Sequence, residues 1–122
     1  MVLMTSEEFE GFTSEMRESP WLASEDILGF SELPVTIESV HKHKDVAFDQ
    51  GRKKDVVYAI KFAGTTKQLV LNATNRKTLV RMFGSNVKRW KEQKVALYVD
   101  TKVKMAGKFV NGIRIKEAKD NG

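Results

Sequence analysis

The sequence contains no cysteine among its 122 residues. Without cysteine there is no disulfide, no thiolate metal site and no cysteine nucleophile, a pattern that fits a cytoplasmic protein. The sequence also lacks an apolar run near the roughly 20 residues of a membrane-spanning helix. Its acidic N-terminus lacks the basic and apolar segments of a secretion signal. We therefore expect a cytoplasmic location and no membrane partner.

Motifs for catalysis are missing as well. There is no P-loop, no nucleophile motif and no spaced set of carboxylates, and the acidic residues cluster near the N-terminus, whereas a two-metal nuclease needs them in one pocket. His41 and His43 would share one face of a strand, but two histidines without cysteine are a weak metal signal. The sequence therefore predicts no enzyme, no metal site and no cofactor.

The formal net charge of +5 conceals two oppositely charged parts. Residues 1–38 carry one cation and nine carboxylates, a net charge of −8, and residues 39–122 carry the other 20 cations and 7 carboxylates, a net charge of +13. A basic body of this kind attracts phosphate polymers. The alternative is a solvated basic surface without a specific partner.

The acidic part, residues 1–32, is predicted to form a helical arm. Phe9, Phe12 and Met16 follow one another at helical spacing, which predicts a helix over residues 5–17 with Thr5 and Glu8 at capping-box spacing. We expect this apolar stripe to pack on the rest of the chain. Two alternatives are that the acidic arm covers a basic groove or docks on a second subunit.

The basic body, residues 33–117, has the alternation of short strands. The strand pattern breaks at Ser39-Val40, which indicates a bulge, and residues 43–54 are predicted to form a loop. Asn111-Gly112 is predicted to be a turn. In the second strand, Val56 and Tyr58 are expected on the core face. The predicted strands span residues 35–42, 55–62, 67–71, 94–100 and 113–116.

One helix is expected between the third and fourth strands, over residues 74–83. Leu79, Met82 and Phe83 form its apolar stripe. Thr74 is the expected N-cap and Gly84 the residue that ends the helix with a positive φ. Trp90, just beyond, is expected to anchor the core.

This order of elements is typical of a mainly β protein with a five-stranded OB-fold-like barrel. Strands this short need closure to protect their edges, and the helix can plug one end of the barrel. An SH3-like barrel is the alternative. Residues 118–122 are expected to be a frayed tail.

Several short motifs add a resemblance that covers roughly residues 21–116. They are Leu71-Asn72-x-Thr74-Asn75, Phe83-Gly84, Trp90, Leu97-Tyr98, Gly107-Lys108 and Gly112-Ile113-Arg114, preceded by Trp21-Leu22 and Glu25-Asp26-Ile27-Leu28-Gly29. This combination resembles small OB-fold-like proteins of bacteriophages and prophages, of the single-stranded DNA-binding type. The resemblance implies a role in DNA replication, recombination or repair. Many single-strand binding proteins end in an acidic tail, which this chain lacks; the acidic arm would have to take that role.

OB-folds bind oligonucleotides on the face of strands 2 and 3 and through the loops between strands 1–2 and 4–5. Single strands are held by cations along the phosphates and by aromatic rings that stack on bases. Phe48 can instead fold back onto the barrel, and Tyr98 can cover a strand edge. The candidate binding residues are Lys42, Lys44, Phe48, Arg52, Lys53, Lys54, Lys61, Tyr98, Lys102, Lys104, Arg114 and Lys116.

The function expected from the sequence is sequence-tolerant binding of single-stranded nucleic acid, DNA rather than RNA. The alternative is a protein-interaction module that binds a phage or host replication protein through its basic surface. A homodimer, formed through the arm or through an open strand edge, is compatible with both.

Overall fold

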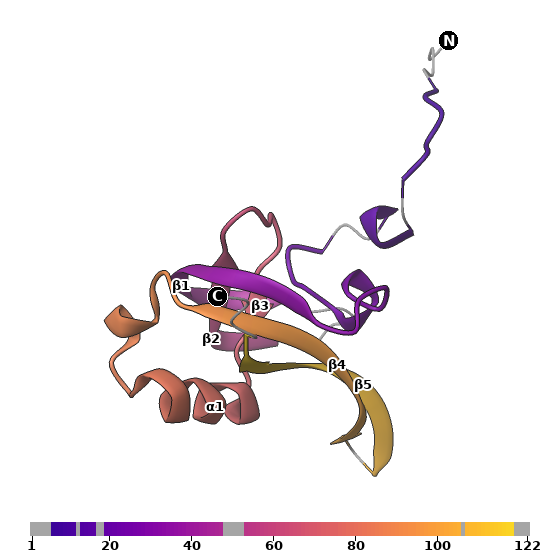
Figure 1. Cartoon of the computed structure of the whole chain (residues 1–122). Helices are drawn as coiled ribbons and strands as arrows, with labels where there is room; N and C mark the ends of the chain where they lie inside the picture. The colour runs from indigo at the N-terminus through magenta and orange to yellow at the C-terminus, as the bar shows by residue number, and fades with distance from the viewer. Residues whose placement is uncertain (1–5, 12, 17–18, 48–52, 106, 119–122) are drawn as a thin grey trace.

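A computed structural model describes residues 6–11, 13–16, 19–47, 53–105 and 107–118 (Figure 1). Five strands form one antiparallel sheet in the order β3-β2-β1-β4-β5. They are β1 (Leu33–Ala47), β2 (Lys53–Phe62), β3 (Leu69–Val70), β4 (Lys94–Met105) and β5 (Lys108–Glu117). The helix α1 (Ala73–Phe83) lies between β3 and β4 in the sequence. The short 3-10 helices are η1 (Thr13–Met16), η2 (Ser24–Asp26) and η4 (Val87–Trp90).

The long strand β1 joins the two halves of the sheet. Residues 33–36 pair with residues 94–97 of β4, and residues 37–47 pair with β2. The register shifts between Ile37 and Ser39, so β1 has the expected irregularity, but just before Ser39-Val40, which pair regularly with Lys61 and Ile60. The loop expected at residues 43–54 is wrong for residues 43–47 and 53–54, because these belong to the paired strands, and its middle, residues 48–52, lies outside the described residues. Their polar composition indicated a loop, yet two paired strands that project into water need no apolar face.

The sheet is open. In the part of the chain that the structure describes, β3 and β5 stand at its two ends and do not pair with each other. The mainly β class and the order of strands and helix are therefore confirmed, whereas the sheet does not close into a barrel.

The core lies on one side of the sheet, where α1 covers it (Figure 1). Val95 and Leu97 of β4 belong to the same cluster of buried side chains as Leu79 of α1. Trp90 is buried and donates from Nε1 to the carbonyl of Gly84 at 2.9 Å, which confirms it as an anchor. Full burial of one large apolar side chain contributes about 1.5–3 kcal/mol.

The helix α1 has the predicted stripe but a different cap. Leu79 is fully buried and Gly84 ends the helix with φ 92°. The N-cap is Asn72 rather than Thr74, because the Oδ1 of Asn72 accepts from the backbone N–H of Asn75 at 2.8 Å. Asparagine is among the strongest N-cap residues.

The N-terminal helix expected over residues 5–17 is wrong for the described residues. Residues 6–11 have no regular structure, and only the 3-10 turn η1 follows. Phe9 and Met16 are 52% and 64% exposed, so they do not pack on the body, and Phe12 lies outside the described residues. A helix of about 12–15 residues is marginal in water without tertiary packing, and Gly11 weakens it further.

The segment from Ser19 to Phe30, in contrast, joins the body. Trp21 forms a parallel bridge with Gln68 beside β3, Asp26 pairs with Lys67 at 3.3 Å, and Ile27 is buried in the core. At 11 residues, α1 is the longest helix in the described ranges, and none of the helices there is long and apolar enough to cross a membrane.

The turn predicted at Asn111-Gly112 is also wrong, since β5 runs through it and Gly112 pairs with Asp100. The register shifts between Asp100 and Val103. A Cβ atom at Gly112 would lie 2.9 Å from Cγ2 of Val103, so glycine here permits a close approach of the two strands.

Candidate nucleic-acid interface

The paired strands β1 and β2 extend past the core, and we call this two-stranded extension the ribbon. It carries a basic, aromatic surface. In the register, Lys42 lies opposite Tyr58 and Lys44 lies opposite Val56. Directly opposite side chains share a face, with Cβ atoms about 4.5–5.5 Å apart. Lys54 joins this face by the alternation of β2. We call the exposed part of this surface the ribbon face; it consists of Lys42, Lys44, Lys54, Val56 and Tyr58. Val46, opposite Lys54, lies on the same side of the strands but is buried.

All five side chains of the ribbon face are exposed. Tyr58 is 49% exposed, and Val56 beside it is also open to water. The three lysines form no ion pair with any residue in the described ranges. Their charge is therefore available to a ligand, next to a ring that can stack on a base.

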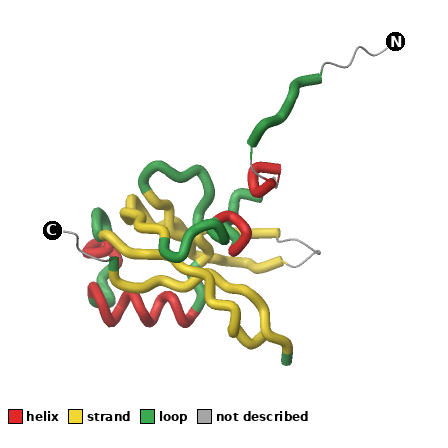
Figure 2. The backbone as a smooth tube through the Cα atoms, turned by 45° about the vertical axis from the view of Figure 1, so that its right-hand side comes forward, coloured by secondary structure: helices red, strands yellow, loops and turns green. Residues whose placement is uncertain are grey.

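The exposure of Tyr58 corrects the sequence-based expectation. Tyr58, Ile60 and Phe62 lie on the same face of β2, but only Ile60 and Phe62 are buried. The core, with α1 against it, ends before Tyr58, and the free end of the ribbon lies on the side away from α1 (Figure 2). Alternation identifies the face of a residue but not where the core ends, so the sequence pattern alone predicts a core position for Tyr58. The available signal in the sequence is the pair of cations Lys42 and Lys44, which lie opposite Tyr58 and Val56.

The other face of the ribbon is partly covered by the N-terminal segment. The ring of Trp21 stands edge-on to His43 with centroids 5.1 Å apart, and His43 hydrogen-bonds through Nε2 to the side chain of Gln68 at 2.9 Å. Val57, opposite His43 in the register, is buried. This contact fixes the N-terminal segment around Trp21 against β1, on the side away from the ribbon face.

Two candidate lysines lie on this covered side rather than on the ribbon face. Lys61 pairs with Glu38 at 3.0 Å, so part of its charge is balanced. Lys53, opposite Ala47, is exposed on the face opposite to Lys54. The structure therefore separates them from the other ribbon lysines.

The outer face of β4 and β5 holds a second group of candidates. Tyr98 lies opposite Arg114, and the Nζ of Lys116 is 5.5 Å from the centroid of the Tyr98 ring. Lys116 forms an ion pair with Glu32, and Arg114 approaches Asp100 at 4.0 Å. Both cations already have carboxylate partners, and Tyr98 is only half-exposed. This group is therefore less available to phosphate than the ribbon face.

The remaining residues predicted to bind nucleic acid belong to neither of these two groups. Lys102 is exposed, and its backbone N–H donates to Oδ1 of Asp100 at 2.8 Å where the register shifts. Lys104 lies in β4 opposite Phe109. Phe48 and Arg52 lie outside the described residues, so the structure does not place them.

No metal site is formed by the side chains in the described ranges, where no three histidine, cysteine or acidic residues come together. The rings of His41 and His43 have centroids 6.3 Å apart, on one face as expected. His41 hydrogen-bonds through Nε2 to Oγ of Ser39 at 2.7 Å, and His43 has the contact with Gln68 described above. Both imidazoles thus have protein partners.

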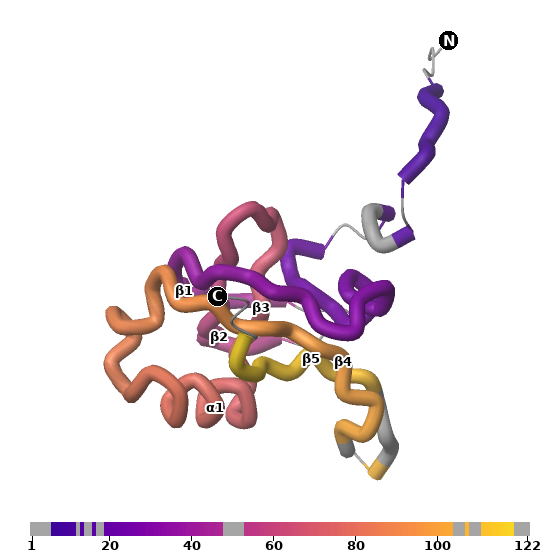
Figure 3. Tube along the Cα trace, viewed as in Figure 1, coloured from indigo at the N-terminus to yellow at the C-terminus, as the bar shows by residue number. Residues whose placement is uncertain are grey.

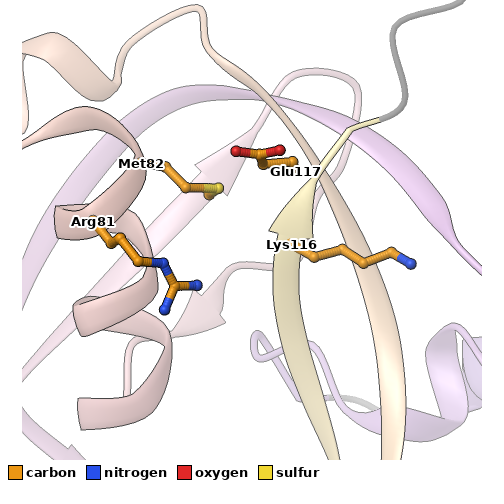
Figure 4. Close-up of a pocket in the computed structure, with 4 residues that line it drawn as sticks. All are labelled: Arg81, Met82, Lys116 and Glu117. Carbon is orange, nitrogen blue, oxygen red and sulfur yellow. The ribbon is translucent and has the colours of Figure 1, made fainter.

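A recess of about 330 Å³ opens between the end of α1 and the end of β5 (Figure 4). Its lining residues are Arg81, Met82, Lys116 and Glu117. Figure 4 shows Met82 and Glu117 directed toward one another, whereas Lys116 points away on the other side of β5. Because this recess contains neither a convergent set of polar groups nor an aromatic wall, we do not place a ligand there.

The outer side of α1 and the turn η4 form a second basic surface, which we call the helix face. It consists of eight exposed residues, six of them cations: Arg76, Lys77, Val80, Arg81, Val87, Lys88, Arg89 and Lys91. The first four share one side of α1 because they stand at i, i+1, i+4 and i+5. Within residues 76–92 the single acidic residue is Glu92.

No protein-family model matches this chain, and neither a curated protein nor a solved structure has significant similarity to it. The resemblance to phage proteins remains a prediction from short motifs.

Proposed function

We propose that this protein binds single-stranded nucleic acid, DNA in preference to RNA, along the ribbon face and without strong sequence preference. The observation that carries the proposal is the exposed ring of Tyr58 directly opposite Lys42. A single strand is held by cations that follow its phosphates and by rings that stack on its bases, and stacking is sequence-tolerant because every base has a π face.

The architecture supports an OB-like version of this function. β1 bends at the bulge and is shared between two halves of the sheet, and α1 lies between β3 and β4. In OB-folds the second and third strands provide a binding face, and Tyr58 of β2 occupies a comparable place. The preference for DNA and the role in phage replication, recombination or repair follow from the motif resemblance and belong to the proposal.

The test is fluorescence anisotropy with a labelled oligonucleotide of about 30 bases, single-stranded and duplex, over a salt series. The unmodified protein should bind the single strand more tightly, with an affinity that falls as salt rises. A ribbon variant, with Lys42→Glu, Lys44→Glu and Lys54→Glu, should lose most of this binding.

The matched control is a helix variant with Arg76→Glu, Lys77→Glu and Lys88→Glu. It changes the net charge by the same amount on a different surface, so it should keep a clear preference for the single strand. Equal, weak binding of the unmodified protein to both oligonucleotides, lost near physiological salt, would contradict the proposal. Equal losses in the two variants would show that only overall charge matters.

The alternative, a protein-interaction module for a phage or host replication protein, is favoured by the exposed side chains of Phe9 and Met16 in the acidic arm. It requires one stoichiometric protein partner that remains bound after nuclease treatment, together with the absence of specific oligonucleotide binding. Tight single-strand binding by the unmodified protein would count against it.

A further inference from the structure

The exposed cations of the helix face differ from the half-buried cations of the body. Lys67, Arg114 and Lys116 each approach a carboxylate within 4.0 Å or less. The six cations of the helix face form no ion pair with any residue in the described ranges. This surface therefore has a strong positive charge that the described part of the chain does not balance.

The helix face also exposes two apolar side chains. Val80 is 39% and Val87 is 43% exposed, and α1 and η4 contact one another. A phosphate backbone would balance the cations but would give the valines no apolar contact. An acidic peptide with large apolar side chains would satisfy both. The chemistry of this face thus favours such a peptide over nucleic acid.

The chain itself contains a segment of this chemistry. Residues 6–16 include four glutamates, no cation, and the exposed apolar side chains of Phe9 and Met16. We use the name arm for residues 6–16 alone, which are a part of the acidic residues 1–32. Figures 1 and 3 show that the arm leads away from the body, with α1 on the opposite side of the molecule. The helix face of its own chain is therefore not where the arm is directed.

We infer that the arm docks on the helix face of a second copy of this chain. Glutamates of the arm lie against the cations of α1 and η4, and Phe9 contacts the surface at Val80 and Val87. A reciprocal exchange of two arms gives a closed, two-fold symmetric dimer. The ribbon face is not part of this contact, so the inference does not depend on nucleic-acid binding.

The test is sedimentation equilibrium of the nuclease-treated full chain at low and high salt. We expect dimers at low salt and monomers at high salt, because screening shortens the range of exposed charges from about 10 Å at 0.1 M to about 3 Å at 1 M. An arm variant, with Glu7→Lys, Glu8→Lys and Glu10→Lys, and the helix variant should each weaken the dimer by about tenfold or more.

The decisive protein combines both sets of changes in one chain. The arm changes raise the formal net charge of +5 by six and the helix changes lower it by six, so the doubly reversed chain keeps a formal net charge of +5. It should dimerise as the unmodified chain does, because each reversed arm meets a reversed helix face. The helix changes should be tolerated, since acidic residues are favourable near the start of a helix, and the thermal midpoint verifies this.

Three more comparisons test the apolar part of the docking contact and the choice of surface. Phe9→Ser should weaken the dimer, whereas Phe30→Ser, which alters an equally exposed ring in the segment that joins the body, should not. The ribbon variant should dimerise normally.

The inference is overturned by any of four results. These are a monomer at all concentrations and at low salt, a dimer that survives arm reversal, a doubly reversed chain that remains monomeric, or a dimer lost in the ribbon variant but kept in the helix variant. Binding of duplex or single-stranded DNA by the helix face, without self-association, would assign this surface to nucleic acid instead.

Discussion

The side-chain amide of Asn75 donates to the backbone carbonyl of Ile113 at 3.0 Å. Its Oδ1 accepts from the backbone N–H of Ile115 at 3.2 Å. Residues two apart in a strand direct their backbone groups to the same edge of that strand. The Asn75 side chain therefore makes the two hydrogen bonds that the backbone of a neighbouring strand would otherwise make to β5. The edge of β5 is thereby joined to the helix that follows β3, although the described parts of β3 and β5 do not pair. Because Asn75 is 1% exposed, it cannot contact a base.

Replacing this amide should destabilise the fold. Asn75→Leu leaves the carbonyl of Ile113 and the N–H of Ile115 buried without partners, which costs about 1–3 kcal/mol per group. Urea unfolding measures the loss. Asn111→Leu, at an exposed position of the same strand, should stay within about 0.5 kcal/mol of the unmodified protein. Similar values for the two variants would mean that the amide does not hold this edge.

The close approach at Gly112 gives a second stability prediction. Gly112→Ala puts a Cβ 2.9 Å from Cγ2 of Val103, and such overpacking typically costs about 1–3 kcal/mol. Val103→Ala removes that atom, so the cost of Gly112→Ala should largely disappear in the double variant. A double-mutant cycle by thermal unfolding measures this coupling. Strictly additive effects would show that the strands separate without strain.

Much of the fold could be predicted because local signals agreed with the final packing. Val95 and Leu97 alternate with residues on the outer face, and Leu79 lies in the stripe of a helix that Gly84 ends. These patterns depend on neighbours within a few residues, which is why they can be recognised in the sequence. The cap was misplaced by two residues, since Asn72 and Thr74 both have suitable side chains.

The binding surface could not be predicted to the same degree. Tyr58 follows the core alternation, and only the three-dimensional extent of the core exposes it. Lys116 was proposed as a binding residue, but its partner Glu32 is distant in the sequence. The arm was expected to pack because Phe9 and Met16 have helical spacing, yet the described fold does not bring a surface of the body against them.

The ring of Tyr58 should contribute directly to affinity for single strands. Tyr58→Ala should weaken binding by about 1–3 kcal/mol, which is about 5-fold to 150-fold. Tyr58→Phe keeps the ring and should retain most of the affinity. Tyr98→Ala is the matched control, because this half-exposed tyrosine lies beneath Lys116 on the outer face. Anisotropy measures all three. A larger loss for Tyr98→Ala than for Tyr58→Ala would move the stacking site to β4 and β5.

The salt dependence of binding should distinguish lysines that meet phosphate from those that do not. A log–log plot of affinity against salt loses about 0.7 of its slope for each phosphate contact removed from a single strand. Lys42→Gln should reduce the slope by about this amount, because Lys42 has no ion pair with the described residues. Lys116→Gln should hardly change it, since Lys116 is paired with Glu32 and would have to leave that carboxylate to reach a phosphate. If the two changes lower the slope equally, the nucleic acid extends over the outer face of β4 and β5, and the ribbon face is only part of its path.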